Sequence, residues 1–470
     1  MLKEKCGVIA IFDHSGKNVA KDLYEGLIAL QHRGQESAGV ATSNGESIAF
    51  VKGLGLVTEA IKIYQLDYLN GFAGIGHVRY STTGEISIRD TQPLIYYINE
   101  EIYFAIAFNG TISNYYKLKK KLSKNGFEFY TDTDTEVLAA LISYYWRETR
   151  DFFEALKESV KSIEGAYSLV LLTNNGELYA MRDPLGFKPL VLGEKNERLI
   201  IASESAAVES IKGRFLRDVE PGEIISISDG TVTRKVVIRR DKRAHCMFEY
   251  VYFSRPDSVI NGRLVYDVRF KLGETLARLY PVDADIIVPV PDTGVIAALG
   301  YSKVSGIPVA MGLIRNPYVG RTFIKPKQNL RELSVQLKLG AVKDVVAGKS
   351  IVLIDDSIVR GTTIKWIIKL LRSAGAREIH VRITCPPIRY PCYMGIDFPM
   401  RRELIAANHS VDEIREIIGA DSLGYMTIEG LVKAIGLGEN RLCLACLTGK
   451  YPIKGIQIPI LEKVFGREQI

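Results

Sequence analysis

The sequence is poor in cysteine, contains no long apolar run and carries little net charge. Six cysteines in 470 residues are too few for a disulfide scaffold, which favours a reducing, cytoplasmic setting. No apolar stretch approaches the roughly 18 residues that span a bilayer, and the opening MLKEKCG lacks the apolar core of a secretory signal. The net charge of +7 leaves 61 basic residues nearly balanced by 54 acidic ones. These absences exclude a disulfide mini-domain and a membrane span, and they argue against a dedicated nucleic-acid binder.

Internal repeats and low-complexity tracts are absent too, and the length exceeds what one hydrophobic core supports, which predicts two domains. The first half is typical of antiparallel sheet with helices. The spans 7–12, 72–82 and 102–110 read as strands, and 20–31 reads as a helix. Asn175-Gly176 between two strand-like runs predicts a hairpin with a type I′ turn.

After the basic run at 234–245, the second half has the sequence pattern of a different type of sheet. Residues 285–290 and 350–354 are almost continuously apolar, as in strands buried on both faces of a parallel sheet. A helix follows, with Gly375 as its stop and 378–383 as the returning strand. Its apolar face consists of residues at i, i+3, i+4 and i+7, namely Ile364, Ile367, Ile368 and Leu371.

The stretch VLIDDSIVRGTT (352–363) places a polar loop between a strand and that helix. Backbone N–H groups at a helix start can hold a phosphate, helped by the hydroxyls of Ser357, Thr362 and Thr363. Asp355 and Asp356 repel phosphate, and we therefore expect them to face sugar hydroxyls or Mg²⁺. The alternative is a simple helix cap with solvated acids, which the full order of elements makes less attractive.

Cys6 allows two interpretations. Free cysteine is often a small buried hydrophobe at the start of a strand. If residues 1–5 were removed, however, its α-amino group, with a pKa of about 7.7 to 8.0, could act as the base for its own thiol.

Four further cysteines predict a metal site. Cys443 and Cys446 form a C-x-x-C pair, and Cys246 and Cys392 are distant in sequence. Spacing alone leaves zinc and an iron–sulfur cluster equally open, beside a redox disulfide or unligated buried thiols. Cys385 has no assigned role and is expected to be a buried thiol.

Five stretches of the first half resemble N-terminal-nucleophile glutamine amidotransferases, in the family's order: CGVIAIF, ALQHRGQESAGVAT, GIGHVRYSTTG, FNGTISN and TDTDTE. The resemblance implies that Cys6 attacks the glutamine amide, and that Asn109 and the N–H of Gly110 form the oxyanion hole. It also implies that Arg79 binds the substrate carboxylate and Asp134 its ammonium group. Phe108 is a departure, because the family often has histidine there.

VLIDDSIVRGTT itself resembles the phosphoribosyl pyrophosphate loop of type I phosphoribosyltransferases. The resemblance implies that this loop binds the substrate through Asp355, Asp356, Ser357, Arg360, Gly361, Thr362 and Thr363. VPDTG (290–294) would add Thr293 to the two aspartates around one Mg²⁺ per subunit. RNPYVGRTFI (315–324) resembles the loop that brings in Arg321, although Pro317 stands where an arginine is expected.

Together with HCMFEYVYFSRPDS, YPCYMGID and CLACLTGKYP, these motifs resemble the cluster-bearing branch of the amidophosphoribosyltransferase family over essentially the whole chain. The implied fold is an N-terminal-nucleophile αββα sandwich over 6–240, after a propeptide of residues 1–5. A type I phosphoribosyltransferase α/β domain would follow over 241–470. Cys246, Cys392, Cys443 and Cys446 would ligate a 4Fe–4S cluster. Glutamine and phosphoribosyl pyrophosphate would be the substrates, with purine nucleotides as feedback inhibitors of a homotetramer.

Three alternatives stay open. A glutaminase joined to a sugar isomerase would not need VLIDDSIVRGTT. A non-enzymatic sensor of phosphoribosyl pyrophosphate that regulates purine metabolism would not need the glutaminase motifs. An unprocessed or degenerate enzyme would keep the fold without the reaction.

Overall fold

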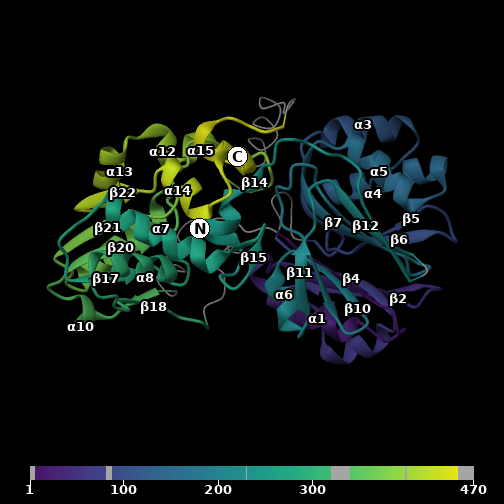
Figure 1. The fold of residues 1–470 in the computed structure, drawn as a ribbon, viewed down its shortest axis with the longest axis horizontal. Helices are drawn as coiled ribbons and strands as arrows, with labels where there is room; N and C mark the ends of the chain where they lie inside the picture. The colour runs from purple at the N-terminus through teal and green to yellow at the C-terminus, as the bar shows by residue number, and fades with distance from the viewer. Residues whose placement is uncertain are drawn as a thin grey trace.

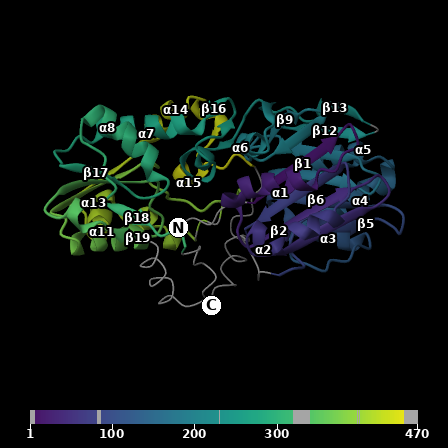
Figure 2. The same cartoon turned by 90° about the horizontal axis from the view of Figure 1, so that it is seen from below.

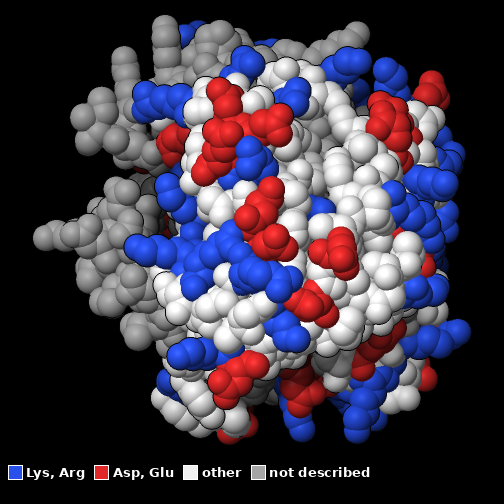
Figure 3. Space-filling view, turned by 90° about the vertical axis from the view of Figure 1, so that its left-hand side faces the viewer, with Lys and Arg blue, Asp and Glu red and all other residues white. Residues whose placement is uncertain are grey.

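The chain forms two halves that lie side by side in both views of the computed structural model (Figures 1 and 2). The structure describes residues 6–80, 87–228, 230–318, 339–396, 398 and 400–453. Within these residues no helix is both long and apolar enough to cross a bilayer. Acidic and basic side chains are interspersed on the end face of the second half, as the small net charge leads one to expect (Figure 3).

The first half contains two antiparallel sheets. One has the order β11-β9-β10-β1-β4-β2-β3, with β1 (Gly7–Asp13), β2 (Ser37–Ser43), β3 (Ile48–Leu54), β4 (Ala73–Arg79), β9 (Val191–Lys195), β10 (Arg198–Ala202) and β11 (Arg214–Asp218). The other has the order β13-β12-β8-β7-β6-β5, with β5 (Leu94–Tyr97), β6 (Tyr103–Ile112), β7 (Gly165–Thr173), β8 (Leu178–Arg182), β12 (Glu223–Ser228) and β13 (Thr231–Val236).

Helices cover the outer faces of these sheets. The helical segments of this half are α1 (Ala20–Ala29), η1 (Gln31–Arg33), α2 (Val57–Ala60), η2 (Ile63–Tyr68), α3 (Tyr115–Lys124), α4 (Asp134–Thr149), α5 (Phe152–Ser162) and α6 (Ser205–Ser210). Strand β1 is apolar along most of its length because both of its faces are buried. Val8 and Ala10 pack between the two sheets, whereas Ile9 and Ile11 pack under α1. The result is the αββα layering expected from the sequence.

The hairpin between β7 and β8 differs from the expected type I′ turn. Thr173 N–H donates to the carbonyl of Glu177 (2.9 Å), which leaves a loop of three residues. Gly176 has a φ of +88°, whereas Asn175 is not among the residues of positive φ. A type I′ turn needs positive φ at both central positions, and a three-residue loop needs it at its last position alone.

The second half is built on a parallel sheet in the order β17-β20-β21-β22, with β17 (Ile286–Pro289), β20 (Ser350–Asp355), β21 (Glu378–Ile383) and β22 (Ser422–Tyr425). Its helical segments are η3 (Glu249–Phe253), α7 (Val265–Leu279), α8 (Gly294–Ser305), α10 (Lys343–Val346), α11 (Thr362–Ser373), η5 (Arg401–Glu403), α12 (Ile405–Asn408), α13 (Val411–Ile418), α14 (Ile428–Ile435), η6 (Glu439–Arg441) and α15 (Ala445–Thr448). Two-stranded pairs join β14 (His245–Cys246) to β23 (Leu442–Cys443), β15 (Val259–Ile260) to β16 (Arg263–Leu264), and β18 (Leu313–Arg315) to β19 (Leu339–Ala341).

The β20–α11–β21 unit forms as the apolar spacing predicts. The buried residues of α11 are Ile364, Ile367, Ile368 and Leu371. Gly375 has a φ of +96° just beyond the helix end, the left-handed conformation that glycine adopts without strain. The loop between β20 and α11 therefore lies at the carboxyl end of a central strand, where α/β sheets bind ligands.

Candidate functional site

The loop between β20 and α11 is held in a conformation that its glycine permits. Gly361 directly precedes α11 and has a φ of +81°. A Cβ atom there would also approach Cδ1 of Ile405 to 2.7 Å. Both constraints favour glycine, and the first N–H groups of α11 are thereby turned toward the loop.

Asp355 and Asp356 are buried at the end of β20, and Thr293 meets them from the start of α8. The Thr293 hydroxyl donates to Oδ2 of Asp356 (2.5 Å), and the Ser357 hydroxyl donates to Oδ1 (2.5 Å). Burial and the neighbouring Asp356 carboxylate raise the pKa of Asp355 well above its ordinary value. Burial also raises the pKa of Asp356, although the hydrogen bonds from Ser357 and Thr293 act to lower it. The three residues expected around a metal ion are thus brought together.

These acids open onto a cavity of about 480 Å³. Several residues that the sequence singles out line this cavity: Thr293, Asp355, Asp356, Ser357, Arg360, Gly361, Thr362 and Thr363. His32 and Gln35 of the first half line the same cavity. Arg360 pairs with Glu403 (Nε to Oε2, 2.8 Å). Arg321 lies outside the described residues.

Arg269 is a residue of this cavity that the motifs did not reveal. It is buried on α7 and donates to the carbonyls of Tyr250 (3.0 Å), Tyr252 (2.9 Å) and Ser254 (2.8 Å). Burial lowers its pKa to about 10, against the opposing charge of Asp356. No local sequence pattern predicts this position for Arg269, because its partners are backbone carbonyls, which every residue type supplies.

In the first half, Cys6 directly precedes β1 and is half-buried. Its Sγ lies 3.7 Å from the carbonyl oxygen of Tyr80. Burial raises the pKa of the thiol, while the Tyr80 contact and the charge of Arg79 act to lower it. Asp134 and Lys188 also act electrostatically on this thiol, which places both close to Cys6.

The polar groups near Cys6 are buried and incompletely paired. Nη1 of Arg79 and both side-chain polar atoms of Asn109 have no hydrogen-bond partner among the described residues. Asp134, the first residue of α4, accepts a hydrogen bond from Ile112 N–H (3.3 Å). Burial raises its pKa to about 6, against that hydrogen bond and the charge of Arg79. Buried polar groups without partners are rare in folded proteins and are expected where a ligand completes them.

Gly110 follows Asn109 on β6, where the neighbouring strand β7 leaves no space for a side chain. A Cβ atom there would meet the Ala166 carbonyl oxygen at 2.3 Å and Cβ of Tyr167 at 2.6 Å. Phe108, the departure from the resembled family, is buried and stacks on Tyr167. Its side chain therefore serves packing and does not reach the polar group.

His77 on β4 was missed by the sequence analysis. It is fully buried, and its Nε2 lies 3.2 Å from the Phe108 carbonyl oxygen. Burial and the charge of Arg79 lower its pKa to about 3, and the ring is therefore neutral and donates to that carbonyl. It supports the backbone immediately before Asn109.

The four distant cysteines line one small cavity between the halves. Cys246 and Cys443 are paired residues of β14 and β23, while Cys446 lies on α15. Burial raises the pKa of Cys446 well above its usual value, and Cys392 and three other cysteines add to the effect. Among the described residues, no three His, Cys, Asp or Glu side chains are grouped tightly enough to hold a single metal ion.

Cys385 is a buried thiol, as expected. Its backbone N–H donates to the carbonyl of Asp356 (2.9 Å). Further along the same segment, the N–H groups of Arg389 and Tyr390 each donate to the Cys446 carbonyl (3.0 Å). The segment after β21 therefore connects the acid pair to the four-cysteine cavity.

Comparison with known proteins assigns both halves. A glutamine amidotransferase domain model matches residues 77–210, and a phosphoribosyl transferase domain model matches residues 261–390. The amidophosphoribosyltransferase of Methanocaldococcus jannaschii is 49% identical over 98% of this chain and 100% of its own length. The chain belongs to the amidophosphoribosyltransferase family.

Other relatives and solved structures agree. The amidophosphoribosyltransferase of Bacillus subtilis is 44% identical over 98% of this chain and 97% of its own length. The structure of the B. subtilis glutamine phosphoribosylpyrophosphate amidotransferase with ADP and GMP has a TM-score of 0.88 at 44% identity, covering 96% of this chain and 98% of that one. A second structure, described as the allosteric regulatory enzyme of purine biosynthesis, has a TM-score of 0.90 at 43% identity, covering 98% and 99%.

The domain matches and the relatives confirm the family that the sequence motifs predicted, and the solved structures confirm the predicted fold class. They also confirm that the chain is an enzyme joining a glutamine amidotransferase to a phosphoribosyltransferase. The non-enzymatic alternative gains no support from these relatives.

Proposed function

We propose that the chain makes 5-phosphoribosylamine from glutamine and phosphoribosyl pyrophosphate, the first step of de novo purine synthesis. Glutamine is hydrolysed in the first half, and the ammonia displaces diphosphate from the anomeric carbon in the second, leaving glutamate and diphosphate. One observation carries the proposal. A single chain pairs a half-buried cysteine, near buried polar groups that have no partner among the described residues, with an acid-lined cavity beside a phosphate-type loop.

At the glutamine site, Cys6 is the nucleophile and attacks the side-chain amide carbon. Its α-amino group, exposed when residues 1–5 are removed, accepts the thiol proton. Asn109 and the N–H of Gly110 stabilise the oxyanion. The side-chain amide of Asn109, which has no partner in the described part of the chain, supports this role. Arg79 binds the α-carboxylate and Asp134 the α-ammonium group. Water then releases glutamate from the thioester.

At the second site, the loop after β20 binds the 5′-phosphate through Ser357, Arg360, Gly361, Thr362 and Thr363. Asp355 and Asp356 bind the ribose hydroxyls, and Arg321 stabilises the diphosphate. Ammonia attacks the anomeric carbon as the bond to diphosphate breaks. The cavity of about 480 Å³ supports a substrate of this size.

The residues present fit one Mg²⁺ per subunit. Oxygen donors are what Mg²⁺ prefers, and Thr293, Asp355 and Asp356 supply them, with the Thr293 hydroxyl 2.5 Å from Oδ2 of Asp356. Burial raises the pKa of both carboxylates, and a bound cation would offset the charge of their ionised forms. When bound, the ion would offset charge on the diphosphate leaving group.

The four-cysteine cavity fits a 4Fe–4S cluster held by Cys246, Cys392, Cys443 and Cys446. The four cysteines line one cavity, and four cysteine thiolates are the usual ligands of such a cluster. The cluster would be structural, because its ligands join β14, β23 and α15 with the segment after β21.

Further features follow by family membership. We propose feedback inhibition by purine nucleotides, a homotetrameric assembly and a cytoplasmic location. The solved relative with ADP and GMP supports the first of these. We also propose the boundaries 1–5 for the propeptide, 6–240 for the amidotransferase domain and 241–470 for the phosphoribosyltransferase domain.

The test measures diphosphate release from phosphoribosyl pyrophosphate with glutamine or with ammonium as the nitrogen source. We expect Cys6→Ala to lose the glutamine-dependent reaction and to keep the ammonium-dependent one within twofold. Asp356→Asn should lose both. Glutamine-dependent release by Cys6→Ala would contradict the role of Cys6, and phosphoribosyl pyrophosphate binding without release in wild-type protein would favour a sensor.

A further inference from the structure

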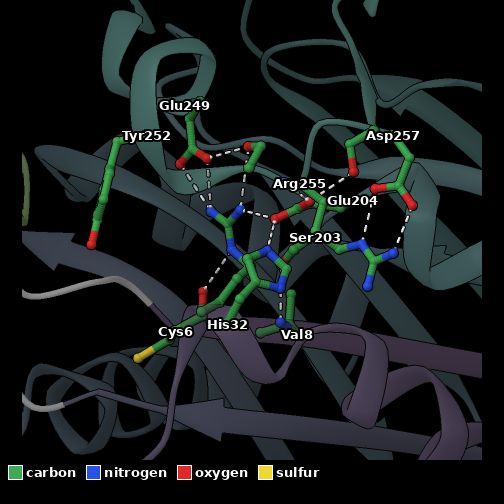
Figure 4. Close-up of polar contacts among 12 residues, drawn as sticks. Cys6, Val8, His32, Ser203, Glu204, Glu249, Tyr252, Arg255 and Asp257 are labelled. Carbon is green, nitrogen blue, oxygen red and sulfur yellow. Dashed lines mark hydrogen bonds and ion pairs between the residues drawn. The ribbon is translucent and has the colours of Figure 1, made fainter. Parts of the chain in front are cut away.

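A buried arginine joins the two halves directly beneath Cys6. Arg33, at the end of η1, is 1% exposed. Its Nε donates to the carbonyl oxygen of Cys6 (3.3 Å). Its Nη2 donates to both carboxylate oxygens of Glu249 (2.9 and 3.0 Å), and Nη1 donates to Glu204 (Figure 4).

The two carboxylates around Arg33 come from different halves. Glu204 precedes α6 in the first half, whereas Glu249 opens the π-helix η3 in the second. Burial alone would lower the pKa of Arg33, but the charges of Glu249 and Glu204 raise it above its ordinary value. The arginine is therefore a fixed cation whose orientation is set by these two acids.

The two acids are not equivalent. Glu204 also accepts hydrogen bonds from His32 (2.7 Å), the Arg255 N–H (2.9 Å) and the Ser258 hydroxyl (2.7 Å). Glu249 has one further contact, from the Ser254 hydroxyl (2.7 Å). Both carboxylate oxygens of Glu249 thus accept from Nη2 of Arg33, and this contact and the Glu204 contact on Nη1 together orient the guanidinium.

Cys6 needs such support, because it lies outside the strand ladder. Register pairing begins at Gly7, which faces Val78. A Cβ atom on Gly7 would meet Cδ of Arg33 at 3.4 Å, and the arginine therefore also packs under the Cys6–Gly7 backbone. A residue at the end of a strand is otherwise free to pivot, and catalysis is sensitive to displacements near 1 Å.

We propose that Glu249 is a positioning residue for the nucleophile: it holds Arg33, and Arg33 holds the carbonyl of Cys6. The inference rests on the proposed role of Cys6. It makes a side chain of the phosphoribosyltransferase half necessary for glutamine chemistry in the other half. Glutamine binding itself, at Arg79 and Asp134, does not involve Glu249.

The experiment compares Glu249→Gln with Glu223→Gln in the full chain. Glu223 is a matched control, because it is buried and receives a two-pronged arginine contact from Arg217 (2.8 and 2.6 Å). Glutamine-dependent kcat, KM for glutamine and ammonium-dependent activity are measured. A second readout is the rate at which a diazoketone analogue of glutamine alkylates Cys6.

For Glu249→Gln we expect at least a tenfold loss of kcat and a parallel loss of alkylation rate. KM and ammonium-dependent activity should stay within twofold of wild type. Glu223→Gln should match wild type in all four. Arg33→Lys keeps the charge without the planar fork, and the double variant Arg33→Lys/Glu249→Gln should be no slower than the slower single variant.

The proposal would be overturned by unchanged kcat in Glu249→Gln, by additive losses in the double variant or by equal losses in Glu223→Gln. Loss of ammonium-dependent activity in Glu249→Gln would do so too, because the residue would then serve the fold of its own half. Wild-type protein without glutamine-dependent activity would instead refute the proposed function.

Discussion

Asp134 gives a prediction whose size follows from its surroundings. Burial raises its pKa to about 6, although the Ile112 N–H and the charge of Arg79 act in the other direction. A raised pKa means that the carboxylate takes up a proton at higher pH than an exposed aspartate does. Because its proposed partner is the α-ammonium group of glutamine, the ionised form alone is competent to bind.

The expected pH profile has two acid limbs. The α-amino group of Cys6 must be neutral to act as the base, which gives a limb at its pKa of about 7.7 to 8.0. Below about pH 6 the protonation of Asp134 adds a second limb, and the slope of log kcat/KM against pH rises from one to two. At one pH unit below the Asp134 pKa, about one molecule in eleven retains the carboxylate.

Asp134→Asn removes the charge and with it the second limb. Loss of a hydrogen bond to a charged group costs about 1.5–3 kcal/mol, which predicts a fall in kcat/KM for glutamine of about 10- to 150-fold at pH 7.5. Its slope should stay at one down to pH 5. Asp132→Asn is the matched control, because Asp132 is two residues away, fully exposed and paired with Lys119.

The assay is glutamate release at saturating phosphoribosyl pyrophosphate between pH 5 and 9, with ammonium-dependent diphosphate release as the internal reference. A second limb near pH 6 that persists in Asp134→Asn would show that protonation of Asp134 does not produce this limb. The same limb in the ammonium-dependent reaction would place its origin outside the glutamine site.

Three further predictions concern the oxyanion group and the loop after β20. Asn109→Ala should lower glutamine-dependent kcat by about 10²–10³ and leave ammonium-dependent diphosphate release intact; an equal loss of both would show that Asn109 serves the fold. Burial and the Asp356 charge raise the pKa of Asp355 in the folded protein. The folded state is therefore more stable while Asp355 is protonated, and it loses this stability as the pH rises and Asp355 ionises. Without Mg²⁺, Asp355→Asn should therefore unfold about 2–4 °C higher than wild type at pH 8, followed by tryptophan fluorescence, and should show no difference at pH 4; a lower midpoint at pH 8 would contradict this. Gly361→Ala forces a φ of +81° on alanine and a 2.7 Å approach to Ile405, and should weaken phosphoribosyl pyrophosphate binding by about tenfold, measured by calorimetry; unchanged affinity would mean that this backbone geometry does not matter for the substrate.

The sequence was sufficient where structure follows from local chemistry. The spacing of Ile364, Ile367, Ile368 and Leu371 defines the buried face of α11, and Gly375 marks its end. The two acids and the hydroxyl residues that follow them line one cavity with Thr293, as their position between a strand and a helix predicts. In each case the controlling residues lie within one structural unit or follow neighbouring strands.

The sequence was insufficient where partners lie far apart in the chain. Arg33 and Glu249 are 216 positions apart, and neither stands in a local pattern that indicates the other. The role of His77 becomes visible only from its contact with the Phe108 carbonyl. This contact exists only once the two sheets have stacked on each other. The turn at Asn175-Gly176 was wrong by one residue, because strand register decides the loop length and is fixed by packing along both strands.

The central claim, that Cys6 acts with its own α-amino group, is tested most directly by the intact mass of denatured, purified protein. Active-site titration of the same sample with the diazoketone analogue supplies the fraction of competent sites. We expect a mass short by MLKEK, in a fraction of molecules equal to the fraction titrated. Full-length protein that is titrated completely and hydrolyses glutamine would contradict it.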